Sequence, residues 1–325
     1  MEMTKILVTG GKGFIGSHLV NYLKAKGYNV KSTDIVKNSY LKTYEDKFFC
    51  GDLRDVYVAL KVTKDIDWVF NLAANMGGIG FISKVGADVM RDNALINISI
   101  VNACVKNNVK RIFFSSSACV YPDYRQEHEH SEALKEEYAV PAAPDQFYGW
   151  EKLFTEKLME AYKKDYETSI RIARFHNIYG SHGTYTGGRE KAPAALCRKV
   201  ASAKDGDNIE IWGDGKQERS FLYIDDALEA IYMLMRSNYD KPLNIGSDKL
   251  ISIDGLADLI IKISGKKLTK KYDLSKPQGV RSRNADLTLI QKVLGWRPKI
   301  SYEEGLAKTY KWVEEQIQAE ASGYA

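Results

Sequence analysis

The sequence predicts an α/β fold in which a doubly wound parallel sheet, with helices on both faces, is joined to a smaller C-terminal α/β domain. Two observations lead to this prediction. From Lys5 to about Phe175, short runs of β-branched and aromatic residues alternate with longer helical segments, a pattern typical of successive strand and helix units. After Tyr179 this alternation gives way to a glycine-rich loop, which indicates a second structural unit.

The strands of the sheet are expected at six short apolar runs. These span residues 5–9, 29–33, about 48–50, 68–73, 111–116 and about 169–175. Apolar residues at helical spacing predict helices near 14–26, 55–63, 88–107 and 145–165. The last two helices are long enough to offer a face beyond the sheet. That face either forms a dimer interface or packs only on its own sheet, and a homodimer is the slightly favoured expectation.

A glycine-rich turn directly follows the first strand, in the segment Thr-Gly-Gly-Lys-Gly-Phe-Ile-Gly. Gly10 permits the tight turn, Gly13 lets the backbone approach a pyrophosphate, and Gly16 lets the next helix pack closely on the strand. Asp34 ends the second strand, where a carboxylate can accept hydrogen bonds from an adenosine ribose. These features predict a Rossmann-type domain that binds NAD in preference to NADP, a preference that nearby Lys37 softens.

The chain after the glycine-rich loop is predicted to contribute segments to both domains. A helix is expected near 192–203, a turn at 212–215, a strand at 221–223, a helix capped by Asp225, and a strand end at 244–246. We therefore assign residues 1–175 and about 221–248 to the NAD-binding domain. Residues 176–220 and 249–325 are assigned to a substrate-binding domain.

Composition excludes several classes of protein. The 325 residues contain no apolar run long enough to span a membrane and begin without a signal-peptide pattern, so a cytoplasmic protein without membrane contact is expected. The net charge of +5 is modest for this length and gives no reason to expect nucleic acid. Cys50, Cys104 and Cys197 are expected to be small buried residues, and the cysteine spacing predicts no metal site.

A phenol and an ammonium group stand four residues apart, at Tyr148 and Lys152. On one helix face, this spacing allows Lys152 to lower the pKa of the phenol, so that Tyr148 can act as a base. The strand ending in Ser115-Ser116-Ser117 leads to the carboxyl edge of the same sheet, where ligands of such folds bind. Ser117 is predicted to contact the substrate oxygen, while the other two serines cap the strand.

The order of these motifs resembles the extended short-chain dehydrogenase/reductase family, in which a glycine-rich turn, an acidic strand end, Ser and Tyr-x-x-x-Lys follow one another. The segments 174–180, 219–226 and 244–247 agree with this resemblance, although Ser181 stands where a proline is common. The resemblance implies an NAD-dependent enzyme whose cofactor is held by Gly10, Gly13, Phe14, Ile15, Gly16, Asp34, Asp52, Leu53, Leu72, Ala73, Ala74, Tyr148 and Lys152.

Three longer stretches, at 73–81, 116–122 and 187–195, resemble the branch of this family that epimerises GDP-mannose at C3 and C5. That resemblance implies Cys119 and Lys191 as an acid/base pair acting on the sugar ring, beside Ser117, Tyr148 and Lys152. It also implies a GDP-sugar substrate contacted by Gly77, Ser117, Ala118, Cys119, Asn177, Glu190, Lys191, Ala192, Lys199, Gln217, Arg219, Arg281 and Arg283. Guanidinium groups suit a diphosphate, and one of the three arginines is expected to form an ordinary ion pair instead.

Three other functions stay open at the level of sequence. A GDP-4-keto-sugar epimerase/reductase of the GDP-fucose synthase type would use NADPH and carry histidine at position 191, so Asp34 and Lys191 speak against it. A UDP-sugar 4-epimerase would need only a threonine-like residue at position 119. A non-enzymatic dinucleotide sensor or scaffold would have no use for an activated phenol at Tyr148.

Overall fold

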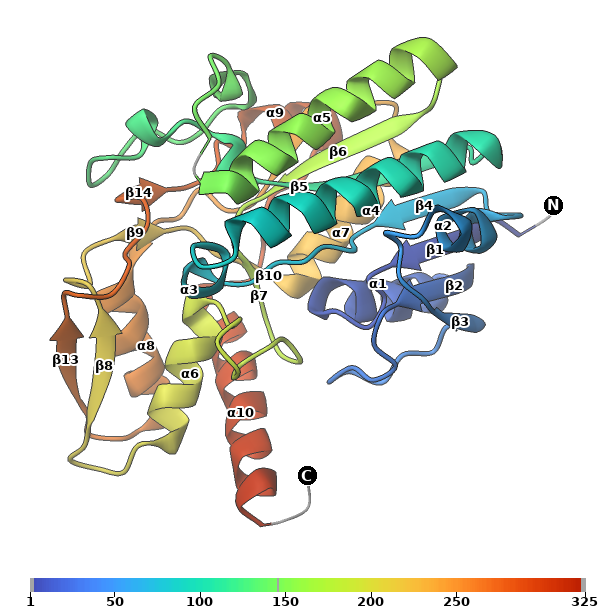
Figure 1. Ribbon diagram of the computed structural model, residues 1–325. Helices are drawn as coiled ribbons and strands as arrows, with labels where there is room; N and C mark the ends of the chain where they lie inside the picture. Colours follow the sequence, from blue (N-terminus) through green and yellow to red (C-terminus); the bar gives the residue numbers. More distant parts are fainter. Residues whose placement is uncertain (1–2, 145, 323–325) are drawn as a thin grey trace.

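The computed structural model describes residues 3–144 and 146–322, and its centre is a seven-stranded parallel sheet (Figure 1). The strand order is β11-β6-β5-β4-β1-β2-β3. The strands are β1 (Lys5–Thr9), β2 (Asn29–Asp34), β3 (Lys47–Cys50), β4 (Trp68–Asn71), β5 (Arg111–Ser117), β6 (Ile170–Phe175) and β11 (Pro242–Ile245). The doubly wound parallel sheet predicted from the sequence is therefore confirmed, with the fourth strand ending earlier than expected.

Helices cover both faces of this sheet. One face packs against α1 (Phe14–Ala25) and α7 (Ile224–Arg236), and the other against α2 (Val56–Thr63), α4 (Gly86–Lys106) and α5 (Gln146–Tyr166). Successive strand residues point to opposite faces, so Ile6 of β1 joins the first core and Leu7 joins the second. Of the predicted fourth helix, residue 145 lies outside the described residues.

A second group of elements lies beyond the carboxyl edge of the sheet (Figure 1). It contains α6 (Ala192–Ser202), α8 (Ile253–Ser264) and α10 (Tyr302–Ala321), together with the parallel pair β8 (Asn208–Trp212) and β13 (Thr269–Asp273). A small sheet of β12 (Ile251–Ser252), β9 (Glu218–Arg219) and β14 (Ser282–Arg283) lies between this group and the main sheet.

Short elements complete the chain. The strands β7 (Ile178–Tyr179) and β10 (Leu222–Tyr223) pair in parallel, and α3 (Ile79–Ile82) and α9 (Thr288–Leu294) are short helices. Three 3₁₀ turns follow β5, namely η1 (Ala118–Val120), η2 (Asp123–Arg125) and η3 (Glu136–Ala139). Among residues 3–144 and 146–322, no helix is both long and apolar enough to cross a bilayer.

Two local predictions are wrong. Cys104 and Cys197 are buried as expected, but Cys50 is exposed, because it ends the edge strand β3, which no further strand covers in the described sheet. Asp225 does not cap its helix. The strand β10 runs directly into α7, so Tyr223 is the N-cap and Asp225 lies in the first turn, where its carboxylate faces the positive end of the helix dipole.

Candidate active site

A cavity of about 720 Å³ opens at the carboxyl edge of the main sheet, where the turns after β1, β2, β4 and β5 meet the segment 180–194. The structure places every residue predicted to contact the cofactor on its wall: Gly10, Gly13, Phe14, Ile15, Gly16, Asp34, Asp52, Leu53, Leu72, Ala73, Ala74, Tyr148 and Lys152. Gly77, Ser117 and Lys191 line the same cavity. Residues from distant parts of the sequence therefore share one site.

The glycine-rich turn fits a dinucleotide pyrophosphate. Gly10 has φ +65°, and a Cβ atom on Gly16 would lie 2.0 Å from the carbonyl oxygen of Gly10. The turn can therefore close this tightly only with glycine at these positions. Gly13 is the N-cap of α1, so the first amides of the helix face the cavity and can bind an anion. Asp34 ends β2, and its Oδ2 accepts a hydrogen bond from the Lys12 amide at 2.9 Å.

Tyr148, Lys152 and Ser117 come together at the end of β5. Tyr148 and Lys152 on α5 are 8% and 1% exposed. The Lys152 ammonium donates to the carbonyl oxygen of Ser115 at 3.0 Å and lies 5.6 Å from the centre of the Tyr148 ring. Of the other two serines, Ser115 donates to the Asn71 carbonyl and Ser116 to the Glu156 carboxylate, so Ser117 alone of the three lies beside the phenol.

The prediction that Lys152 lowers the pKa of the phenol is wrong for this structure. Burial raises the pKa of Tyr148, and Cys119 and Glu151 raise it further, while a hydrogen bond with Ser117 opposes the rise. Burial also lowers the pKa of Lys152 itself. Because both groups are buried, desolvation sets the direction of both pKa shifts.

Cys119 lies beside Tyr148 because η1 packs against α5. A Cβ atom on Gly149 would lie 2.1 Å from the Cys119 carbonyl oxygen, so glycine at this position lets the two elements touch. The half-buried Cys119 thiol accepts a hydrogen bond from Arg283 Nη1 at 3.3 Å. Arg283 Nε in turn donates to the fully buried Gln126 at 2.5 Å, a contact that the sequence did not reveal.

Lys191, which is distant from Cys119 in the sequence, lies close enough to it for the two groups to interact electrostatically. It is the N-cap residue of α6, burial lowers its pKa, and the charge of Cys119 opposes that shift. Cys119 thus acts electrostatically on both Tyr148 and Lys191. The site holds a thiol, an ammonium group and a phenol close together, which is sufficient for proton transfer at more than one position of a bound ligand.

The segment that carries Lys191 is docked on the loop after β4. The Gly78 amide donates to the Arg189 carbonyl oxygen at 3.0 Å, and a Cβ atom on Gly78 would lie 2.5 Å from the carbonyl oxygen of Glu190. Arg189 Nη1 donates to Asn75 Oδ1 and to the Met76 carbonyl oxygen, both at 3.2 Å. Sequence reasoning missed Arg189, although the Gly-Gly pairs at 77–78 and 187–188 signal a close backbone approach.

The other predicted substrate contacts are not among the residues that line this cavity. Ala118 follows Ser117 in η1, and Glu190 and Ala192 flank Lys191. Arg219 and Arg283 are register partners on β9 and β14, and Asn177 donates to the Ser220 carbonyl at 3.0 Å. Gln217 is 4% exposed, and within the part of the chain that the structure describes its amide oxygen has no partner. Lys199 donates to the Glu210 carbonyl oxygen at 2.7 Å.

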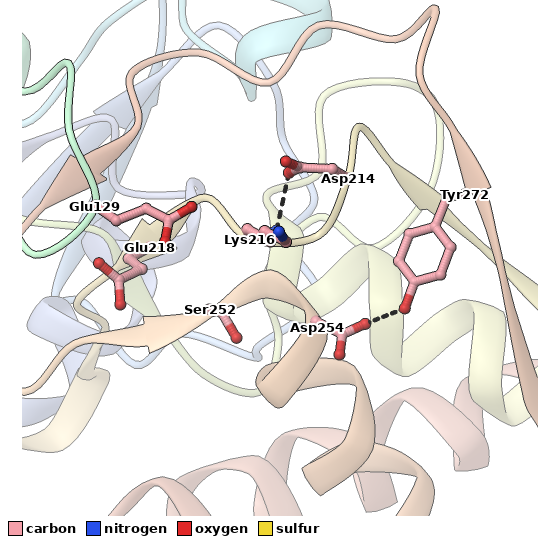
Figure 2. A pocket seen from close by; sticks show the side chains of 7 residues that line it. All are labelled: Glu129, Asp214, Lys216, Glu218, Ser252, Asp254 and Tyr272. Atoms are coloured by element: carbon pink, nitrogen blue, oxygen red, sulfur yellow. Dashed lines mark hydrogen bonds between the residues drawn. The ribbon is translucent and has the colours of Figure 1, made fainter.

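Arg281 forms ion pairs within the protein. It borders a second hollow of about 460 Å³, shown in Figure 2 and lined by Glu129, Asp214, Lys216, Glu218, Ser252, Asp254 and Tyr272. Arg281 binds Asp214 at 2.9 Å and also pairs with Glu129. Asp254 pairs with Lys270 at 2.8 Å and accepts from Tyr272. The carboxylates of this hollow are thus engaged within the protein.

Comparisons with known proteins agree with this geometry. The chain is 45% identical to a GDP-mannose 3,5-epimerase of Arabidopsis thaliana, over 98% of the chain and 84% of that relative. It is 29% identical to a GDP-L-fucose synthase of Escherichia coli strain K12, over 96% of the chain and 97% of that relative. Its fold matches a UDP-glucose 4-epimerase of Thermotoga maritima, solved with UDP-glucose, with a TM-score of 0.86, 26% identity and coverage of 97% and 100%.

The family model that matches covers residues 6–246 and is described as the NAD dependent epimerase/dehydratase family. This range contains the glycine-rich turn, Ser117, Cys119, Tyr148, Lys152 and Lys191. The chain therefore belongs to the NAD dependent epimerase/dehydratase family, as an enzyme that uses NAD.

Proposed function

We propose that the chain epimerises GDP-mannose at C3 and C5, giving GDP-L-galactose, and GDP-L-gulose when C5 alone inverts. One observation carries this proposal. Cys119 and Lys191 lie beside Ser117 and Tyr148, so the site has two proton-transferring groups beyond those that a C4 oxidation needs. The 45% identity to a GDP-mannose 3,5-epimerase supports the same substrate.

The chemistry follows from the acidity of the sugar. A proton on a ring carbon is too weakly acidic for a side chain to remove, but a ketone at C4 allows the carbanion at C3 or C5 to delocalise as an enolate. Bound NAD supplies reversible oxidation at C4. The proposed holders of NAD are the turn at Gly10, Gly13 and Gly16, with Asp34 at the ribose.

Each side chain then has a separate task. Ser117 binds the C4 oxygen, and Tyr148 exchanges the proton of the C4 hydroxyl, while Lys152 holds the end of β5 through the Ser115 carbonyl. Inversion at a carbon needs one group to remove a proton from one face and another group to return a proton on the opposite face. We assign these two roles to Cys119 and Lys191. Gln217, Arg219 and Arg283 are proposed to bind the nucleotide end.

Competing functions make different demands on these residues. A UDP-sugar 4-epimerase has no step for a second acid/base pair, so Cys119 and Lys191 would be idle. A GDP-fucose synthase type of enzyme needs a substrate that is already a ketone and an NADPH supply. A sensor or scaffold would show neither isotope exchange nor product.

The test is incubation of the purified protein with GDP-mannose in heavy water. The wild-type protein should introduce deuterium at C5 and at C3, read by mass spectrometry and NMR. Cys119→Ser should keep C4 oxidation, followed by the absorbance of the bound cofactor, and lose exchange, because the thiol is the proton carrier. Tyr148→Phe should lose both.

The matched control is Cys50→Ser, because Cys50 is exposed and off the cavity and should leave exchange unchanged. Undiminished deuterium incorporation in Cys119→Ser would contradict the assignment of the thiol. Mass spectrometry of any nucleotide sugar that copurifies with the chain would identify the base. The cytoplasmic location expected from the sequence stays a prediction.

We also propose that the chain forms a homodimer through α4 and α5. These two helices lie side by side on one face of the sheet (Figure 1), and their outer surface carries exposed large apolar side chains: Leu95, Ile98, Phe147, Trp150 and Phe154, which are 40–62% exposed. Leu153 and Leu158 face inward instead. The helix thus packs on its own domain with one face and offers another to a second copy.

A further inference from the structure

Lys12 is a cation in the dinucleotide cavity whose charge is already neutralised. It stands inside the glycine-rich turn and lines the cavity, and its ammonium group binds Glu45 Oε1 at 2.6 Å and the Thr43 hydroxyl. The two charged side chains are 10% and 6% exposed. Because they are shielded from solvent, salt screens this ion pair less than a surface pair.

This ion pair lies at the ribose end of the site. The Lys12 amide donates to Asp34 Oδ2 at 2.9 Å, so the residue that carries the ammonium also orients the proposed ribose-binding carboxylate. The Lys12 ammonium lies 4.6 Å from the centre of the Phe48 ring on β3. Glu45 and Phe48 therefore hold the Lys12 ammonium group near the edge strand β3.

Glu45 is itself fixed in place. Its Oε1 also accepts a hydrogen bond at 3.1 Å from the hydroxyl of Ser32, which stands two residues before Asp34 on β2. Another cation of the cavity, Arg54, is similarly engaged, with Asp52 at 2.6 Å and Asp92 at 3.1 Å. A phosphate group on the adenosine ribose would thus meet the Asp34 carboxylate and two cations that are held by other carboxylates.

We propose that Glu45 is a specificity-determining residue for the cofactor. By holding Lys12 in a buried ion pair, Glu45 withholds the ammonium group that would otherwise bind the 2′-phosphate of a phosphorylated dinucleotide, and the chain selects NAD over NADP. The inference rests on the proposed cofactor site and is independent of the sugar substrate. Asp34 repels the phosphate directly, and Glu45 removes the compensating charge.

The experiment measures the dissociation constants of NAD⁺ and NADP⁺ by titration calorimetry on protein freed of bound nucleotide. Glu45→Gln keeps the shape of the side chain and releases Lys12, so it should tighten NADP⁺ binding about tenfold and change NAD⁺ binding by less than about threefold. The gain should shrink as salt is added. Glu45→Ala provides the same test if the amide variant does not fold.

The matched control is the double variant Glu45→Gln/Lys12→Met, which should lose the gain in NADP⁺ affinity. An unchanged ratio of the two affinities in a folded Glu45→Gln protein would overturn the proposal, and so would a gain that persists in the double variant. Failure of the wild-type protein to bind NAD⁺ would instead refute the cofactor site itself, so the two failures are distinguishable.

Discussion

Arg283 donates to the Cys119 thiol at 3.3 Å and to Gln126 at 2.5 Å. Only a planar fork with several donors can serve both at once. Gln126 is completely buried, at 0% exposed, and its amide nitrogen donates to the Tyr121 and Pro122 carbonyl oxygens. It therefore fixes the direction from which Arg283 approaches the thiol.

We expect Arg283→Lys to lower kcat for GDP-mannose by roughly tenfold to one-hundredfold, a loss of about 1.4–2.8 kcal/mol of transition-state stabilisation. A single ammonium group cannot reach both acceptors, so the thiol loses its orientation. The measurement is the rate of deuterium incorporation under saturating substrate. Arg281→Lys is the comparison, because its partners Asp214 and Glu129 accept a lysine equally well. Equal losses in both variants would argue against a special role for Arg283.

Contacts between helices and turns determine where the side chains of the site lie. The long strands and helices could be predicted because alternating and helical spacing of apolar residues are local signals. The two-residue strands β9 and β14 had no such signal, because they exist only through pairing across distant segments. The same limit hid the bond between Gln126 and Arg283 and the ion pair between Lys12 and Glu45.

Site residues were predictable to the degree that they stood in motifs. Gly10, Asp34, Tyr148 and Lys152 belong to short patterns with a known spacing, and the structure puts them on one cavity wall. The effect of Lys152 on Tyr148 was not predictable, because spacing along a helix does not report burial, and burial sets the direction of both pKa shifts.

The contact between α5 and η1 makes a sharp prediction for Gly149→Ala. In an open helix, alanine would stabilise by up to about 1 kcal/mol. Here the new Cβ atom would meet the Cys119 carbonyl oxygen, so we expect a lower melting temperature and a larger loss of deuterium exchange than of NAD⁺ affinity. The control is Gly255→Ala in α8, where the nearest atom to a Cβ would lie 3.2 Å away. A stabilised and fully active Gly149→Ala would contradict the packing argument.

For the whole molecule, a buried histidine couples stability to pH. His176 is 0% exposed and bonds Asn244 at 3.0 Å, and burial lowers its pKa to about 3. The folded protein keeps the ring neutral, whereas the unfolded chain protonates it below about pH 6.5. This stabilisation is therefore complete above that pH and is lost as the pH falls toward the folded-state value.

We accordingly expect His176 to cost about 2 kcal/mol of folding free energy at pH 5 relative to pH 7. Urea unfolding at the two pH values measures this loss. His176→Gln keeps a hydrogen-bonding group toward Asn244 but cannot titrate, so its stability should depend less on pH over this range. A variant with the same pH dependence as the wild-type protein would show that other groups carry the effect.

The outer surface of α4 and α5 is where we expect two copies of the chain to associate. Five large apolar side chains gather there, among them Trp150 and Phe154 at 46% and 48% exposed, and a monomer would leave them in water. Paired across a two-fold axis, the same surface meets itself, as isologous interfaces do. We expect light scattering to give a dimer for the wild-type chain and a monomer for Trp150→Glu/Phe154→Glu, since two buried carboxylates per copy cost several kcal/mol without a partner.

Tyr57→Glu is the control, because Tyr57 is 78% exposed on α2, outside this surface. A monomeric wild-type chain at micromolar concentration would exclude the interface, whereas a dimer that survives the double substitution would place it elsewhere on the molecule.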